Sequence, residues 1–223
     1  MGTSVSVVYY SGFQGATEQL AKATARGAET IDGTTAHLIH TDTVDDHWDT
    51  LHASDAIIFG SPTYVGSVAA KFKEFIEKLA GEIWLNRLWL NKVSGGFTVS
   101  AGRSGDKMNC LQDLSVAAAQ MGMIWVPVRI TGGNYSSQGS EEDLNRMAGY
   151  LGVMAQANID EPADITPPPS DIATAEMHGA HIASVAKQMA MGRGNYTADW
   201  EDNIAGLRGG VTGRLPKGLK DLG

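Results

Sequence analysis

The segment Ser4–Glu18, SVSVVYYSGFQGATE, decides how the rest of this chain is interpreted. It opens with an apolar, β-branched run through Val5, Val7 and Val8, which is typical of a strand buried on both faces. Small and loop-forming residues occupy positions 11–17, and beyond them apolar residues recur at three- and four-residue steps, as they do in a helix. This order of strand, short loop and helix predicts the first unit of an α/β fold.

The loop between this strand and this helix has the features of an anion site. The first amides of a helix have no intrahelical partner, and the helix dipole adds partial positive charge beside them. Gly12 and Gly15 let the backbone approach a ligand without an intervening Cβ. The loop is neither a Walker A motif nor a dinucleotide fingerprint, so a phosphate in a different kind of cradle is expected. The alternative is an ordinary strand–helix turn with Thr17 as the helix cap.

Composition limits the classes of protein that this chain can belong to. Its 223 residues, 43% of them hydrophobic, are enough for one well-packed domain without disulfides. The one cysteine, Cys110, can form no internal disulfide and is expected to pack in the core. A net charge of −8 argues against a nucleic-acid partner. No signal segment follows Met1 and no apolar run is long enough to span a membrane, so a cytoplasmic protein without membrane insertion is expected.

Strand-like and helix-like segments alternate along the chain, which predicts a doubly wound parallel sheet. After the first strand, further strands are expected at Thr34–Ile39, Asp55–Gly60, Val93–Ser100 and Ile124–Val128, the polar second one at an edge. Helices are expected at Thr17–Glu29, Ser67–Ala80, Lys107–Met121 and Asp171–Met191, with a short helix or loop at Val44–Ala53.

The regular alternation ends after the fifth strand. Residues 131–165 are rich in glycine, asparagine and serine and are interpreted as an insertion, in which a short helix at Leu144–Ala155 is one possibility. Thr166–Ser170 contains three consecutive prolines and is expected to be an extended spacer. We therefore expect one domain over residues 1–191 and a C-terminal tail or arm over 192–223.

Three loops should meet at the carboxyl edge of the sheet, where doubly wound sheets bind their ligands. They span residues 11–17, 61–66 and 100–106, and all are rich in glycine, serine, threonine or proline. The second lies within Gly-Ser-Pro-Thr-Tyr-Val-Gly-Ser at 60–67, and the third lies within Phe-Thr-Val-Ser-Ala-Gly-Arg-Ser-Gly-Asp at 97–106. Their convergence predicts a ligand site.

These loops resemble those of the flavodoxin-like NAD(P)H:quinone oxidoreductases, once named tryptophan-repressor-binding proteins. The similarity runs from Val5 to Val128 and returns at Pro168–Met189. It implies a flavodoxin-like, five-stranded parallel sheet of order 2-1-3-4-5, FMN as the cofactor and NADH or NADPH as co-substrate. It also implies a small-molecule electron acceptor, a quinone or a similar two-electron acceptor, and assembly into a homodimer or homotetramer.

The resemblance also assigns FMN contacts to residues of all three loops. The assigned residues are Ser11, Phe13, Gln14, Gly15, Ala16 and Thr17 around the phosphate; Pro62, Thr63, Tyr64, Val65 and Gly66 along one side of the ring; Ser100, Ala101, Gly102, Arg103, Ser104, Gly105 and Asp106 around its other edge; and Trp84 as a pocket wall. Tyr64 is expected to stack on the ring rather than merely cover the loop, while Trp84, which follows an apolar helix, has core packing as the alternative to a pocket wall. Arg103 is expected to stabilise negative charge at the ring edge, unless it is a solvated loop arginine. No residue is assigned a catalytic role, because the flavin performs the redox step.

Two other functions remain open at this point. The first is a flavodoxin-type FMN electron carrier that serves a protein partner. The second is a phosphate-sensing, receiver-like module, which would need an aspartate at the end of the third strand, where this chain has Gly60-Ser61-Pro62. We therefore rank the enzyme first, the electron carrier second and the receiver last.

Other candidate residues favour structural roles. His178 and His181 have a spacing that suits a metal, but a third ligand is not apparent, so we expect a partly exposed helix face and no metal site. The acidic residues Asp42, Asp45, Asp46 and Asp49 are interpreted as a solvated surface. The apolar residues between Trp84 and Leu90 predict either a subunit interface or internal packing.

Overall fold

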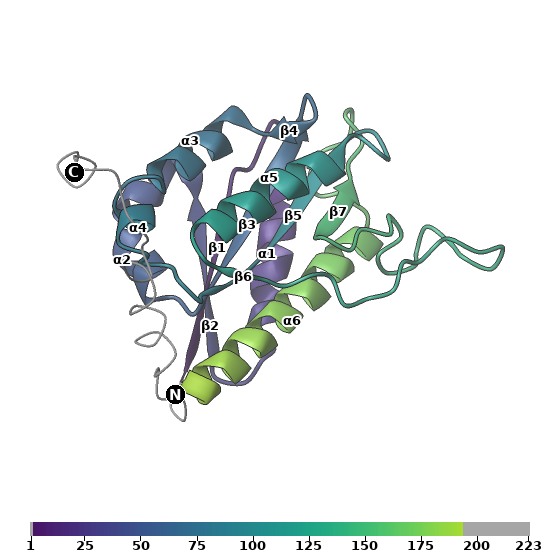
Figure 1. Cartoon of the computed structure of the whole chain (residues 1–223). Coiled ribbons are helices and arrows are strands. Elements are labelled where there is room, and N and C mark those ends of the chain that lie inside the picture. Colours follow the sequence, from purple (N-terminus) through teal and green to yellow (C-terminus); the bar gives the residue numbers. More distant parts are fainter. Residues whose placement is uncertain (1, 194–223) are drawn as a thin grey trace.

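A parallel β-sheet with helices on both faces forms the body of the protein (Figure 1). The structure is a computed structural model, and it describes residues 2–193. The strands are β1 (Thr3–Tyr9), β2 (Thr34–His40), β3 (Ala56–Tyr64), β4 (Ser67–Val68), β5 (Val93–Ser100), β6 (Ile124–Trp125) and β7 (Val153–Gln156). The helices are α1 (Ala16–Glu29), α2 (Trp48–Ala53), α3 (Ala70–Lys78), α4 (Glu82–Leu85), α5 (Lys107–Gln120) and α6 (Pro169–Arg193), with a 3₁₀ turn η1 (Thr41–Asp46).

The order of the main strands confirms the predicted fold. The sheet runs β2-β1-β3-β5-β6 with every neighbouring pair parallel, which is the order 2-1-3-4-5 of the five predicted strands. The polar strand β2 lies at the edge, as expected. One apolar core packs between the sheet and the pair α1 and α6, and a second lies on the face covered by α2, α3 and α5. The tail expected over residues 192–223 starts too early, because α6 extends to Arg193, and residues 194–223 lie outside the described residues.

The last position of the sheet is shared by two short strands. β6 pairs with the start of β5 at Val93 and Ser94, and β7 pairs with its end over Phe97–Ser100. The predicted strand at Ile124–Val128 is therefore too long, because Pro127 has no N–H to continue the ladder. Between β6 and β7 the chain makes a long excursion away from the sheet (Figure 1).

The helix suggested at Leu144–Ala155 is absent from the structure, and β7 begins at Val153, within the last three residues of that range. Glycine explains this difference. Gly152 passes so close to β5 that a Cβ on it would lie 2.5 Å from the carbonyl oxygen of Gly96. Glycine also weakens a helix through its backbone entropy, and Gly149 and Gly152 both lie in this stretch.

The second loop is a β-hairpin. β3 continues past the predicted end at Gly60 as far as Tyr64 and returns through Val65 and Gly66 into β4. Both turn residues have positive φ, 49° and 82°, as a type I′ hairpin turn requires. The helix predicted from Ser67 consequently begins at Ala70.

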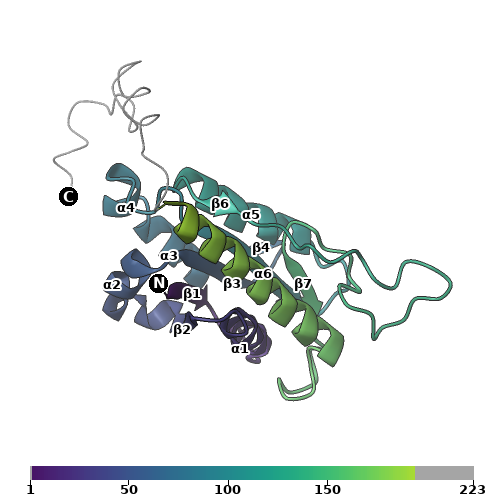
Figure 2. The ribbon, with the colours of Figure 1, turned by 90° about the horizontal axis from the view of Figure 1, so that it is seen from below.

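Helix α6 crosses α1 with their backbones in contact, and Figure 2 shows α6 running along the sheet beside α1. A Cβ on Gly27 of α1 would lie 1.8 Å from the carbonyl oxygen of Glu176, and one on Gly179 of α6 would lie 2.0 Å from that of Thr24. Both positions therefore require glycine. The predicted proline spacer is shorter than expected because Pro169 opens the helix, a position that proline favours.

His178 contradicts the expectation of an exposed helix face. Its side chain is buried, and neither ring nitrogen has a hydrogen-bond partner among residues 2–193. The helix lies across the sheet, so the imidazole packs close to Gly95 of β5. Burial lowers the pKa of His178 to about 3. Within the same described range, no helix has the length and hydropathy that a membrane span needs.

We expect His178 to make the fold acid-sensitive. The unfolded chain binds a proton at this histidine below about pH 6.5 while the folded chain does not, so stability should fall by about 1.4 kcal/mol per pH unit between about pH 6.5 and 3. Replacing His178 by leucine removes an unpaired buried polar group and this proton uptake. Urea unfolding at pH 7 and 5 should show a loss about 2 kcal/mol smaller for His178→Leu than for the unaltered chain. Equal losses in the two proteins would contradict this account.

Candidate functional site

A cavity of about 350 Å³ opens at the carboxyl edge of the sheet, where the turns after β1, β3 and β5 meet. Ten of the predicted FMN contacts line it: Ser11, Phe13, Gln14, Ala16 and Thr17 from the first loop, Pro62, Thr63 and Tyr64 from the hairpin, and Ser100 and Ala101 from the third loop. Gly15, Val65, Gly66 and residues 102–106 belong to the same turns but not to the lining. Sequence reasoning missed Ala157 and Ile159, which follow β7 and line the cavity as well.

Thr17 carries a buried hydroxyl without a partner in the first turn of α1. The helix begins at Ala16, its N-cap is Gly15 with a φ of 79°, and no side chain caps it. Thr17 is therefore inside the helix, which contradicts the alternative in which it caps an ordinary turn. Its Oγ1 has no hydrogen bond within residues 2–193, and a buried hydroxyl left unpaired is costly. An acceptor held in the cavity at the helix N-terminus, such as a phosphate oxygen, would satisfy this group.

Ser11 is held in place by a residue that sequence reasoning did not single out. Its Oγ lies 3.0 Å from Nε2 of His40, the last residue of β2. The backbone N–H of Asp42 donates to Nδ1 of the same ring at 3.2 Å, which anchors the imidazole. The parallel pairing of β1 and β2 places His40 opposite Tyr9, two residues before Ser11, and only this register reveals the contact.

Tyr64 links the hairpin to the first loop. Its hydroxyl accepts a hydrogen bond from the backbone N–H of Phe13 at 2.7 Å. A Cβ on Gly12 would lie 2.9 Å from this hydroxyl and 3.1 Å from Cγ of Pro62, and Gly12 has a φ of 74°. The first loop and the hairpin therefore contact each other closely at Gly12, and Tyr64 forms a wall of the cavity.

A chain of buried side-chain contacts connects the hairpin to β5 and α5. The hydroxyls of Thr63 and Thr98 are 2.7 Å apart, and Thr98 donates to Sγ of Cys110 at 3.3 Å. Cys110 is fully buried, and burial raises the pKa of its thiol. Its predicted role in core packing is confirmed.

The third loop is fixed by donors that lie behind it. Lys107 is fully buried, and its Nζ donates to the carbonyl oxygens of Gly102 at 2.5 Å and Arg103 at 3.1 Å. Nε2 of Gln156 donates to the carbonyl oxygen of Ala101 at 3.1 Å. Burial lowers the pKa of Lys107 to about 8, while the charge of Asp171 acts in the opposite direction.

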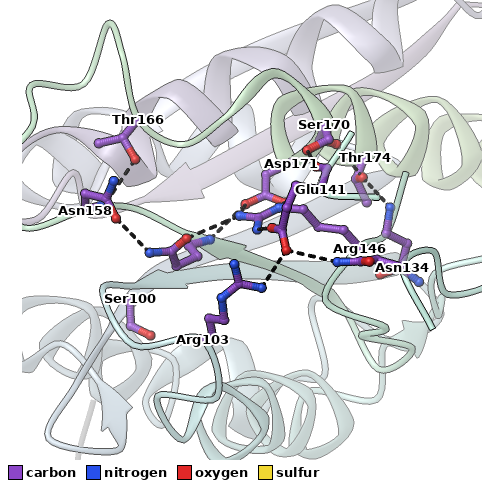
Figure 3. Close-up of polar contacts among 12 residues, drawn as sticks. Ser100, Arg103, Asn134, Glu141, Arg146, Asn158, Thr166, Ser170, Asp171 and Thr174 are labelled. Carbon is purple, nitrogen blue, oxygen red and sulfur yellow. Dashed lines mark hydrogen bonds and ion pairs between the residues drawn. The ribbon is translucent and has the colours of Figure 1, made fainter. Parts of the chain in front are cut away.

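Arg103 points into a network of charged residues and does not line the cavity (Figure 3). Its guanidinium pairs with Glu141 at 2.7 Å, and Glu141 also bonds to Arg146. Arg146 is buried and binds the carboxylate of Asp171 through two hydrogen bonds of 2.8 Å. Asp171 Oδ2 accepts the backbone N–H of Gln156 as well. The network therefore ties residues 131–165 and the third loop to the first turn of α6.

Trp84 lies away from the cavity. It belongs to α4 and packs, half-buried, against the core on the α3 and α5 face. Helix α3 leads the chain back from the hairpin, so α4 lies at the end of α3 that is far from β4 (Figure 1). The apolar segment around it packs partly inside, because Trp89 is fully buried while Leu88 is 39% exposed. Among residues 2–193 there is no group of three histidine, cysteine or acidic side chains that could hold a metal ion.

Comparison with known proteins identifies the family. Residues 11–136 match the family model described as NADPH-dependent FMN reductase. A protein named flavodoxin FldP from Pseudomonas aeruginosa is 35% identical, over 82% of this chain and 96% of its own. A protein named NAD(P)H dehydrogenase (quinone) from Syntrophobacter fumaroxidans is 26% identical, over 83% of this chain and 98% of its own.

A solved structure agrees with this result. The crystal structure of the flavodoxin, WrbA-like protein from Agrobacterium tumefaciens is 36% identical to the chain and superposes with a TM-score of 0.64. It covers 84% of this chain and 99% of its own. The predicted resemblance to the flavodoxin-like NAD(P)H oxidoreductases is thereby confirmed. The chain belongs to the NADPH-dependent FMN reductase family, and is an oxidoreductase that uses FMN and NAD(P)H.

Proposed function

We propose that the chain binds FMN in the cavity at the carboxyl edge of the sheet and transfers hydride from NADH or NADPH to a quinone or a similar two-electron acceptor. The observation that carries this proposal is the buried, unpaired hydroxyl of Thr17, a residue that lines the cavity at the uncapped N-terminus of α1. The cavity is lined by loops for which the sequence predicted FMN contacts. The name of the Syntrophobacter fumaroxidans relative supports a quinone as the acceptor.

The residues present suit the two ends of FMN. At one end, the first amides of α1 and the hydroxyls of Thr17 and Ser11 would bind the phosphate, with residues 13–16 completing the cradle. At the other end, the cavity-lining residues 62–64 of the hairpin and 100–101 of the third loop would enclose the ring, and residues 65–66 and 102–106 would complete the turns around it. When bound, FMN supplies the chemistry of hydride acceptance and donation. The chain itself would bind and orient the cofactor, and the apolar lining residues Pro62, Val99 and Ala157 would limit the access of water to the ring.

A second function is favoured by one specific observation. The relative from Pseudomonas aeruginosa, at 35% identity, is named a flavodoxin, which suggests an FMN electron carrier for a protein partner. Turnover separates the two functions, because an enzyme oxidises NAD(P)H repeatedly with a small acceptor while a carrier needs a partner reductase.

The proposal extends to the organisation of the chain. We propose one domain over residues 1–191, with 131–165 as an insertion, in a cytoplasmic homodimer or homotetramer. The partly exposed apolar side chains of Trp84, Leu85 and Leu88 support an interface between copies. Light scattering coupled to size-exclusion chromatography should give a mass of at least two chains, and a monomer at micromolar concentration would exclude the oligomer.

The oxidoreductase activity can be tested directly. Isothermal titration calorimetry should show one FMN bound per chain, and the loaded protein should oxidise NADH or NADPH only when benzoquinone is supplied. The protein without FMN serves as the control. Failure to bind FMN would overturn the proposal, while FMN binding without turnover would favour the electron carrier.

Thr17 offers a sharper test of the phosphate cradle. Thr17→Val keeps the shape of the side chain and removes its donor, so the Kd for FMN should rise ten- to a hundredfold, as expected for a hydrogen bond to a charged group of about 1.5–3 kcal/mol. The Kd for riboflavin, which lacks the phosphate, should stay unchanged. The matched control is Thr24→Val, because Thr24 lies in the same helix with an equally buried, unpaired hydroxyl and does not line the cavity. An equal effect of both substitutions on FMN would show that Thr17 does not bind the phosphate.

A further inference from the structure

Three consecutive carbonyl groups of the third loop accept hydrogen bonds from side chains of the protein. Gln156 bonds the carbonyl of Ala101, and the single ammonium of Lys107 bonds those of Gly102 and Arg103. A trans peptide holds its N–H opposite to its carbonyl. The N–H groups of Gly102, Arg103 and Ser104 therefore point the other way, toward the exposed side of the turn.

These three amides form a row of unpaired donors. Within residues 2–193, none of them donates a hydrogen bond to a protein acceptor. The N–H groups lie on one side of the turn because Lys107, Gln156 and the hydroxyl of Ser100 hold its carbonyl groups on the other. Removing the ammonium of Lys107, which bonds two of the three carbonyls, would let these peptide groups rotate and place carbonyl oxygens among the N–H groups on the exposed side of the turn.

Lys107 adds charge to this arrangement. Its side chain is fully buried at the start of α5, directly behind the turn. The charges of Asp171 and Arg146 act on Lys107 in opposite directions, and these two residues form an ion pair with each other, while the ammonium of Lys107 bonds only backbone carbonyls. A buried charge acts over a low dielectric and is felt more strongly than a solvated one.

We propose that Lys107 is a positioning and tuning residue of the FMN site, which orients the amides of the third loop and makes the site favour reduced FMN over oxidised FMN. This inference rests on the proposed function. Reduction adds negative charge to the flavin ring, whereas the oxidised ring is neutral. A fixed cation behind a row of amide donors stabilises that charge with little reorganisation. Lys107 thus takes the role that sequence reasoning gave to Arg103, whose guanidinium is paired with Glu141.

The test compares the affinities for the two redox forms of FMN. Lys107→Gln keeps N–H donors for the loop carbonyls and removes the charge, whereas Lys107→Met removes both. The Kd for oxidised FMN comes from calorimetry, and the Kd for reduced FMN follows from the two-electron midpoint potential of the bound flavin. Both substitutions should raise the ratio of reduced to oxidised Kd about tenfold, which lowers the midpoint potential by about 30 mV. Lys107→Met should also weaken binding of oxidised FMN, because it releases the turn.

Two further variants serve as controls. Lys107→Arg keeps the charge and should hold the Kd ratio within about twofold of the unaltered protein. Lys92→Met removes another ammonium that bonds two backbone carbonyls, those of His52 and Ser54, but that lies at the start of β5 away from the cavity. It should leave the ratio unchanged.

The outcomes separate this inference from the function on which it rests. An unchanged Kd ratio in the folded Lys107→Gln protein would overturn the role of Lys107 while FMN binding stands. An equal change in Lys92→Met would overturn it as well, since the effect would then not be local. Failure of the unaltered protein to bind FMN would overturn the proposed function, and the role of Lys107 with it.

Discussion

The backbone contact between α1 and α6 positions the parts from which the site is built. Gly27 and Gly179 bring each helix against a carbonyl oxygen of the other, at a distance that leaves no room for a Cβ. Both helices begin at the carboxyl edge of the sheet: α1 presents Thr17 there, and α6 presents Asp171, which anchors Arg146 and Gln156. Because packed helices do not deform gradually, a side chain at this crossing would displace the N-terminus of α1 and the anchor of the third loop together.

Three buried charged side chains hold the backbone of the third loop rigid, and burying them lowers the stability of the fold. Removing Arg146, Asp171 and Lys107 from water is unfavourable, and only full hydrogen bonding makes it tolerable. Arg146 and Asp171 satisfy each other with two bonds, and Lys107 bonds two carbonyls. A polar network that is satisfied in this way holds one arrangement of the backbone. The loop is therefore preorganised before any ligand arrives.

The spacing of apolar residues along the sequence predicted most of the main helices and strands. The strand β5 and the helix α5 appear within a residue of their predicted bounds, because a long segment carries enough local signal to predict its secondary structure. The hairpin after Gly60 was missed because its turn depends on positive φ at Val65 and Gly66, and β7 was missed because Gly152 serves a contact with the distant strand β5. The burial of His178 and the contact of His40 with Ser11 depend on which element lies opposite, and a single sequence does not show this.

A single sequence also does not show which charged side chains are buried. This explains why Arg103 was the sequence candidate for stabilising negative charge on the flavin ring, and why Lys107 is proposed in its place. In the sequence, Arg103 lies in the middle of the predicted ligand loop, whereas Lys107 is predicted to be the first residue of a helix. In the structure, Arg103 and Glu141 are both largely exposed, so water and salt screen their charges and the pair holds Arg103 only weakly. Lys107 is buried, bonded to the loop itself and unable to turn toward solvent. A charge that acts on a ligand with constant strength must be fixed in this way, and among the cations of this loop and the helix turn that follows it, Lys107 meets that condition.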